Sequence, residues 1–190
     1  MINRDRLVKT FCDLVRIDSP SGEEETIAVD LVQRLEKLGL SVRRDAYGNI
    51  IAGDGRPEPL LLSAHMDTVE PGRGIEPRIE GDRIVSDGTT ILGGDCKAGM
   101  SAILEALESA AEDDTALRPL EVVFTREEEI GIVGARNLDF SMITAKEAIV
   151  FDGEGPSSRI TSSSPTYIGF DLDITGRAAH AGVEPEKGIS

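Results

Sequence analysis

Short apolar runs separated by helical patterns constrain the fold of this 190-residue chain more than any other feature. The run Leu60-Leu61-Leu62 is apolar without alternation, which is typical of a strand covered on both faces. Residues 120–125 and 148–151 indicate two further buried strands, and apolar residues recur at helical spacing over 96–111. Strands that alternate with helices predict an α/β domain with a mainly parallel central sheet.

The segments around these runs carry helix and turn signals. Apolar residues at helical spacing predict a helix over 3–16. A second helix is expected to begin at the capping-box pair Ser21 and Glu24 and to end at Gly39. The remaining elements expected are strands at 41–44 and 49–52, a hairpin near Gly81 and a short helix over 131–138.

A second unit is predicted where the pattern changes, near residue 165. Residues 166–175 alternate with period two, the mark of a half-exposed strand in a new sheet. A lone strand cannot bury its apolar face, so we expect residues 165–190 to be only the beginning of a domain. Residues 1–164 are then a first domain, and the chain is expected to be a fragment of a longer protein.

The charge of the chain excludes several classes of partner. Lys and Arg number 20 against 35 Asp and Glu, for a net charge of −15. Such a chain repels phosphate backbones and anionic lipids, so neither nucleic acid nor membrane is an expected partner. No apolar stretch approaches the roughly 18 residues of a membrane span. The N-terminus lacks a signal-peptide core, and two cysteines make no disulfide framework. We therefore expect a cytoplasmic protein.

Polar residues follow the strand expected at 60–64 and open the helix expected over 96–111. His65 and Asp67 come directly after residues 60–64 and share a face, because residues two apart in an extended chain point the same way. A metal-bound imidazole usually gives its other N–H to a carboxylate, although incidental surface polarity is the alternative. Asp95 lies beside glycines at the helix start, either as a ligand or as an N-cap. Cys96 is expected to pack, because neighbouring side chains on a helix do not converge.

The two later strands also run into acidic residues. Residues 120–125 precede three adjacent glutamates, which repel one another unless cations neutralise them; a solvated helix start is the alternative. Residues 148–151 deliver Asp152 into a glycine-rich loop. Histidine with carboxylates suits zinc, manganese or cobalt better than calcium. Five acids at these ends carry −5 against +4 from two divalent ions, which predicts a two-metal hydrolase site. The five acids are Asp67, Asp95, Glu128, Glu129 and Asp152.

Four motifs together resemble the two-zinc exopeptidase and deacylase family. They are SAHMDTV at 63–69, GGDCKAG at 93–99, TREEEIG at 125–131 and GRAAHAG at 176–182. The sequence around the last two motifs is most similar to the tripeptidase T branch. The resemblance implies a three-layer zinc-peptidase domain over residues 1–164, followed by the start of an inserted α+β lid or dimerisation domain over 165–190.

The resemblance also implies a metal-ligand set. Asp95 would bridge two divalent ions. Zinc is the expected metal, with manganese or cobalt as alternatives. His65 and Asp152 would complete one site. Glu129 would bind the other ion.

Three further residues take catalytic roles by the same resemblance. Glu128 would be the general base. Asp67 would orient His65. His180, in the second domain, would help to hold the reacting carbonyl, often across a dimer, so a homodimer through the lid domain is an expected partner arrangement.

The chain departs from the family in one respect. In the family, the chain returns to the first domain after the lid and supplies a last histidine to the second metal, which this sequence does not contain. We therefore expect this chain alone to be inactive or nearly so.

The function expected is hydrolysis of an amide bond in short peptides, most like a tripeptide aminopeptidase, in the longer parent protein. One alternative is an N-acyl amino acid deacylase of the same family. The other is a non-catalytic, peptidase-like binding fragment that lacks the last metal ligand.

Overall fold

The computed structural model describes residues 1–113, 116–163, 166 and 168–189, in two compact units, Met1–Gly155 and Pro156–Ser190. The domain boundary expected between residues 164 and 165 falls outside the described residues and stays a prediction. None of the helices described is long and apolar enough to span a membrane.

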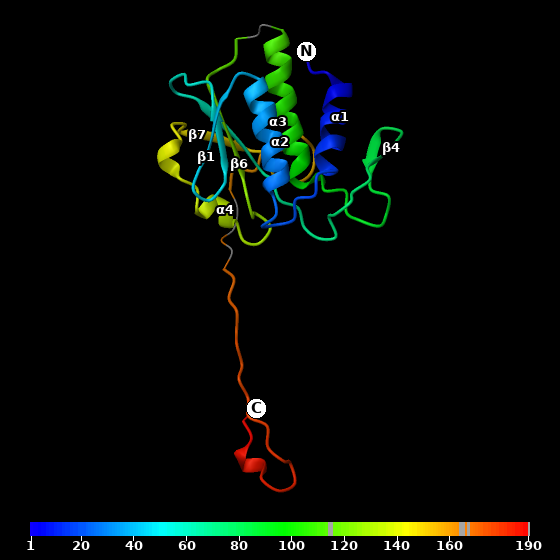
Figure 1. The fold of residues 1–190 in the computed structure, drawn as a ribbon, viewed down its shortest axis with the longest axis vertical. Helices are drawn as coiled ribbons and strands as arrows, with labels where there is room; N and C mark the ends of the chain where they lie inside the picture. Colours follow the sequence, from blue (N-terminus) through cyan, green and yellow to red (C-terminus); the bar gives the residue numbers. More distant parts are fainter. Residues whose placement is uncertain (114–115, 164–165, 167, 190) are drawn as a thin grey trace. The chain divides into compact units, whose positions relative to one another are not determined.

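A five-stranded sheet forms the centre of the first unit (Figure 1). Its order is β1-β2-β6-β3-β7, with β1 Ser41–Arg44, β2 Ile50–Gly53, β3 Leu60–His65, β6 Leu120–Thr125 and β7 Glu147–Val150. β3 runs parallel to both β6 and β7, whereas β1 and β2 are antiparallel. A tight turn at Tyr47-Gly48 joins β1 to β2, and the parallel pairing of β3 with β6 uses a helical crossover. The expected α/β fold is confirmed, with a mixed sheet whose central strands are parallel.

The register of the parallel strands places their carboxyl ends at one edge of the sheet. Leu60 pairs with Leu120 and with Glu147, and His65 pairs with Thr125. Beyond β7, the Phe151 N–H donates to the Ser63 carbonyl at 2.8 Å. The residues that follow β3, β6 and β7 therefore emerge beside one another, which is where open α/β sheets bind ligands.

Helices cover one face of the sheet and pack on its apolar side chains. They are α1 Arg4–Val15, α2 Glu25–Lys37 and α3 Gly94–Glu112. The core includes Leu31 of α2, Met100 of α3 and Phe124 of β6, all fully buried. On the opposite face, the Glu121 carboxylate accepts hydrogen bonds from Thr144, so the segment after α4 (Val133–Arg136) and the 3-10 turn η1 (Phe140–Met142) covers that side.

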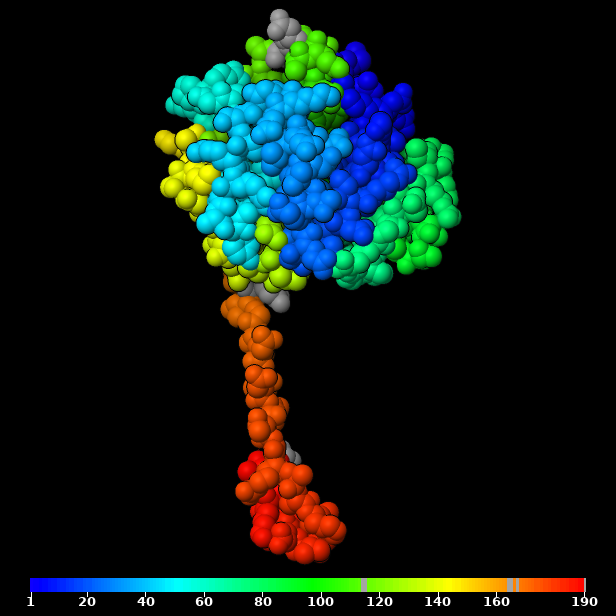
Figure 2. Space-filling view, in the orientation of Figure 1, coloured from blue at the N-terminus to red at the C-terminus, as the bar shows by residue number. Residues whose placement is uncertain are grey.

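The hairpin expected near Gly81 is present as β4 (Arg78–Glu80) and β5 (Arg83–Val85). It lies beside α1 in Figures 1 and 2. A cavity of about 610 Å³ between the hairpin and α1 is lined by residues such as Val8, Cys12 and Ile79. It contains none of the predicted site residues.

Two strand predictions need correction. β7 was expected to be buried, but it is the edge strand, and Ile149 and Val150 are 48% and 63% exposed. An apolar run does not distinguish a covered strand from one whose outer side is open. Residues 166 and 168–175 form no strand, because no neighbouring strand is described there to pair with them; Tyr167 lies outside the described residues.

The second unit contains little regular structure in its described residues. A 3-10 turn, η2, spans Pro185–Lys187. Arg177 and Ile189 form an isolated bridge, with paired backbone hydrogen bonds of 2.9 and 3.0 Å.

Candidate metal centre

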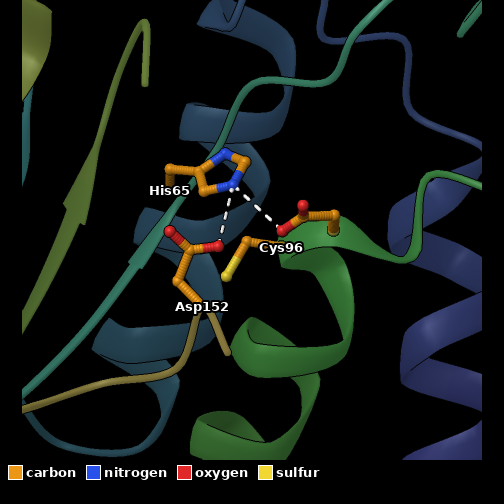
Figure 3. A group of neighbouring side chains, drawn as sticks. His65, Cys96 and Asp152 are labelled. Atoms are coloured by element: carbon orange, nitrogen blue, oxygen red, sulfur yellow. Dashed lines mark hydrogen bonds and ion pairs between the residues drawn. The ribbon is translucent and has the colours of Figure 1, made fainter. Parts of the chain in front are cut away.

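His65, Asp95 and Asp152 converge from three elements at the carboxyl edge of the sheet. Figure 3 shows the His65 ring facing the Asp152 carboxylate. His65 is the last residue of β3, Asp95 lies in the first turn of α3, and Asp152 follows β7 by two residues. The His65 Nε2 atom is 3.3 Å from the Asp95 Oδ1 atom and 3.6 Å from the Asp152 Oδ1 atom. His65 is buried, whereas the Asp95 side chain is exposed, so the group is open to solvent on one side.

These three donors fit a divalent metal ion. Ligand atoms about 2.0–2.1 Å from a tetrahedral zinc ion lie about 3.3 Å apart, close to the spacing from His65 to the two carboxylates. Burial, together with the neighbouring Asp152, raises the pKa of Asp95. A cation between the two carboxylates would remove that repulsion.

The His65 ring is held so that Nε2 faces the carboxylates. Its Nδ1 atom lies 3.0 Å from the Asp67 backbone oxygen, which only accepts, so Nδ1 carries a proton. Burial by itself lowers the pKa of His65, but hydrogen bonds to Asp152 and Asp67 outweigh it and raise the pKa to about 10. Without a metal ion the imidazole is therefore protonated at neutral pH, and metal binding must displace a proton from Nε2.

Asp67 is fully buried and links His65 to the glutamate loop. One carboxylate oxygen lies 3.3 Å from His65 Nδ1 and accepts from the Glu128 N–H at 2.9 Å. The other accepts from the Ser21 hydroxyl at 2.7 Å and the Glu129 N–H at 3.1 Å. Burial raises the pKa of Asp67, but these hydrogen bonds outweigh it and lower the pKa to about 2. Asp67 thus fixes the imidazole and the backbone of both glutamates at once.

The predicted capping box at Ser21 and Glu24 is wrong. α2 begins at Glu25, with no side-chain hydrogen bond at its cap. Ser21 donates to Asp67 instead, and the Glu24 carboxylate accepts from the Glu127 N–H at 3.1 Å. Tertiary partners outcompete the local cap, and both side chains support the candidate site.

Glu128 and Glu129 lie half-buried beside His65. One ligand atom from each of these three residues lies within 4.8 Å of the others. Burial raises the pKa of both glutamates, and the nearby positive charge of His65 does not cancel that effect. A carboxylate whose pKa is raised is better suited to accept a proton than an ordinary surface carboxylate.

Cys96 comes closer to the candidate metal ligands than helix geometry predicts. The backbone of Asp95 (φ −87°, ψ 117°) is not helical, so Asp95 and Cys96 do converge. The Cys96 sulfur joins the group of His65, Asp95 and Asp152 within 4.8 Å. However, the thiol donates to the Phe151 carbonyl at 2.7 Å, and burial raises its pKa to about 12. The protonated thiol packs against the end of β7, in line with a structural role.

His180 lies in the Pro156–Ser190 unit, whose placement relative to the metal centre is not determined. Its Nδ1 atom accepts from the Gly182 N–H at 3.2 Å. Its expected contact with a reacting carbonyl stays a prediction.

Sequence reasoning missed Lys97, which is 1% exposed just behind the site. Its ammonium group donates to the Ser19 hydroxyl at 2.8 Å, to the Thr68 hydroxyl and to the Met66 carbonyl at 3.4 Å. Burial lowers its pKa to about 8. The lysine ties the segment after β3 to the start of α3, and its place among the small and apolar residues that open this helix was the only signal.

Comparison with known proteins identifies the family. A model of peptidase family M20/M25/M40 matches residues 61–167, more than half of the chain. The chain belongs to this family. The resemblance to the two-zinc exopeptidases and deacylases, and to their tripeptidase T-like branch, is confirmed.

Relatives of this M20-family chain cover most or all of it. The uncharacterized protein YqjE of Bacillus subtilis is 39% identical over 201 residues, which cover 100% of this chain and 54% of YqjE. The structure of aminopeptidase PepT from Bacillus cereus has a TM-score of 0.79 and 36% identity, covering 100% of this chain and 54% of PepT. A tripeptidase structure from Staphylococcus aureus has a TM-score of 0.78 and 36% identity, covering 82% and 45%. The chain spans about half the length of these relatives.

Proposed function

We propose that this chain carries the metal-binding part of the active site of a peptidase that cleaves short peptides, most like a tripeptide aminopeptidase. The observation that carries the proposal is the convergence of His65, Asp95 and Asp152, beside Glu128 and Glu129, in a chain of the M20 family. The similarity to an aminopeptidase and to a tripeptidase, each at 36% identity, supports this substrate class.

The proposed cofactor is a pair of divalent ions, with zinc as the proposed metal. His65 and Asp152 would hold the first ion, Glu129 would hold the second, and Asp95 would bridge them. Bound ions of this kind supply polarisation of the scissile carbonyl and a lowered pKa of the attacking water.

Glu128 is the proposed general base. Its carboxylate would accept a proton from the attacking water and later return it to the leaving amine. Asp67 would keep His65 oriented and hold the Glu128 backbone, through contacts of 3.3 and 2.9 Å. His180 is proposed to donate to the carbonyl oxygen as negative charge develops on it.

The second site is incomplete within this chain. Of its proposed ligands, the chain supplies only Asp95 and Glu129, whereas catalytic zinc sites commonly have three protein ligands. We therefore propose that this chain alone has little or no activity, and that one ion binds tightly and a second weakly. We also propose a cytoplasmic location and a homodimer through the domain that begins at residues 165–190.

A substrate panel combined with one variant tests the proposal. Hydrolysis of tripeptides, dipeptides and N-acetylated amino acids is assayed in the presence of zinc. Two proteins are compared: this chain, and a longer protein that adds a histidine ligand for the second ion. Glu128→Gln is expected to lower tripeptide hydrolysis by about 10²–10⁴-fold, with bound zinc unchanged.

Each other outcome contradicts a different part of the proposal. Cleavage of N-acylated amino acids alone would favour the deacylase. Zinc binding by the longer protein without hydrolysis of any substrate would favour a non-catalytic binding domain. Unchanged turnover in Glu128→Gln would exclude Glu128 as the base.

A further inference from the structure

A buried ion pair outside the metal centre holds the loop that carries Glu128 and Glu129. The Glu24 carboxylate is fully buried at the start of α2. One of its oxygens accepts from Arg126 Nε at 2.8 Å and lies 2.7 Å from Arg126 Nη2. The guanidinium side chain is only 20% exposed, so the pair lies largely away from solvent.

The other oxygen of Glu24 holds the backbone of the loop. It accepts from the Gly22 N–H at 2.9 Å and from the Glu127 N–H at 3.1 Å. Glu127 has a φ of 49°, in the left-handed region that non-glycine residues rarely occupy. Such a conformation persists only where surrounding contacts fix it, and Glu24 supplies two of those contacts, through the Arg126 side chain and the Glu127 N–H.

Arg126 is held from other sides as well. Its guanidinium donates to the Tyr47 and Gly22 carbonyls at 3.3 and 3.2 Å, and its backbone N–H donates to the Asn49 side chain at 3.1 Å. A Cβ atom on Gly134 would lie 2.0 Å from the Arg126 backbone oxygen, so α4 packs directly on this residue. The Glu24 carboxylate compensates the charge of Arg126, so the Glu128 and Glu129 carboxylates are left to face the metal centre.

Besides the hydrogen bonds of the loop to the Tyr47 hydroxyl and to the start of α4, two buried carboxylates hold its N–H groups from opposite sides. Asp67 accepts the N–H groups of Glu128 and Glu129 on the side of the metal centre. Glu24 and Arg126 hold the preceding residue from the side of α2. If the contacts of Glu24 are lost, the strained Glu127 can relax, and the two glutamates that follow it turn with the backbone.

We propose that Glu24 and Arg126 are positioning residues: they present the Glu129 carboxylate to the second divalent ion, and hold the Glu128 backbone beside it, without touching that ion. The inference rests on the proposed function. Disturbing the Glu24–Arg126 pair is expected to weaken the affinity for the second ion. The affinity for the first ion, at His65, Asp95 and Asp152, is expected to stay unchanged. A general loss of stability would weaken both ions together.

Titration with Co²⁺, followed by visible absorbance and calorimetry, tests this inference on the full 190-residue chain. Glu24→Gln keeps the size of the side chain and removes its charge. It is expected to weaken the second Co²⁺ by about 10- to 100-fold, the usual cost of losing a residue that supports a ligand. The first Co²⁺ should change by less than about twofold. Arg126→Lys keeps the charge but loses the two-pronged contact, and the same result is expected.

Glu25→Gln is the matched control. Glu25 is the next residue and pairs with Arg44 at 2.7 Å on both oxygens, but it makes no hydrogen bond to the 126–131 loop. This variant should leave both Co²⁺ affinities unchanged. If Glu24→Gln does not fold, Arg126→Lys decides the outcome by itself.

Equal weakening of both Co²⁺ affinities in the variants would overturn the inference, because it would indicate a general loss of stability. Two further results would also overturn it, and they are distinguishable. If the wild-type chain binds two Co²⁺ ions and both variants bind them equally well, only the positioning role fails. If the wild-type chain binds no second Co²⁺, the second metal site of the proposed function fails and the positioning role fails with it.

Discussion

At the scale of single residues, Asp67 does more than its position predicts. The His-x-Asp spacing indicates a carboxylate that orients a histidine, and the structure adds hydrogen bonds to Ser21 and to both glutamate N–H groups. A buried carboxylate with this many donors is replaced poorly by an amide, which offers one acceptor oxygen and an NH₂ group that only donates.

Asp67→Asn should therefore weaken zinc binding by about 10- to 100-fold, as loss of a residue that supports a metal ligand commonly does. A competition titration with a chromophoric chelator measures the change. Ser21→Ala removes only one donor to Asp67 and is the control, with an expected effect of a few-fold at most. Equal zinc affinity in wild type and Asp67→Asn would show that Asp67 does not support the site.

The residues of the candidate metal centre could be picked out because each ends a strand, follows one or opens a helix. Position made His65, Asp95 and Asp152 candidates, and the family resemblance gave them the ligand roles that stay a prediction. Glu24, Lys97 and Arg126 could not, because their roles depend on contacts between elements distant in sequence. Arg126 lies 102 residues from Glu24 in the chain, and no local pattern relates the two.

At the scale of elements, the site depends on how closely α3 approaches the end of β7. A Cβ atom on Gly99 would lie 2.3 Å from the Phe151 backbone oxygen and 2.8 Å from its Cβ atom. Glycine at this position lets the helix that carries Asp95 approach the strand end that carries Asp152.

Gly99→Ala should push α3 away from Phe151 and separate Asp95 from Asp152. We expect a loss of about 1–3 kcal/mol in the free energy of unfolding, the usual cost of overpacking, together with weaker zinc binding. Gly94→Ala in the same helix is the control, because its new Cβ would meet its nearest neighbour at 4.0 Å. Urea unfolding and zinc titration check both variants. Unchanged zinc affinity in Gly99→Ala would contradict the close-approach argument.

A second link between elements joins α1 to α3 through charge. The buried Glu105 carboxylate accepts from Arg6 Nε at 2.6 Å and from the Asn3 N–H at 2.7 Å. The Arg6 hydrogen bonds lower the pKa of Glu105 to about 2, although burial opposes them. Because the folded-state pKa is depressed, this stabilisation is complete above the unfolded pKa of about 4.3 and is lost as the pH falls toward 2.

Glu105→Gln should cost about 1.5–3 kcal/mol in the free energy of unfolding at pH 7, as hydrogen bonds to charged groups do. The difference between wild type and Glu105→Gln in the free energy of unfolding should become smaller as the pH falls from 4.5 to 2. Glu147→Gln breaks an exposed pair with Arg118 and should cost less than about 1 kcal/mol. Thermal unfolding from pH 7 to 2 measures both. If the difference in stability between wild type and Glu105→Gln stays constant down to pH 2, the ion pair with Arg6 is not the cause of that difference.

Most elements were predictable from sequence because apolar spacing identifies helices and strands. The helices α1 to α3 and the strands β1 to β3 and β6 lie within a few residues of their predicted positions. The exposure of β7 and the absence of a strand in the described residues 166 and 168–175 were not predictable, because both depend on which strand lies alongside and not on the residues themselves.

At the scale of the whole molecule, the residues of the candidate metal centre belong to one compact unit. His65, Asp95, Glu128, Glu129 and Asp152 all lie within Met1–Gly155, and the described residues from Pro156 onward are exposed. Limited proteolysis should therefore remove residues after 155 and leave the first unit folded with its zinc. Mass spectrometry and zinc content of the product check this. Loss of zinc on cleavage would indicate that the second unit contributes to the site.

A metal ion bound by His65, Asp95 and Asp152 is the central claim, and the zinc content per chain tests it most directly. Wild-type chain and Asp152→Asn are equilibrated with zinc, desalted and measured by elemental analysis. We expect at least one zinc per wild-type chain, removable by a chelator, and clearly less in Asp152→Asn. A wild-type chain that retains no zinc, or a variant that retains as much as wild type, would contradict it.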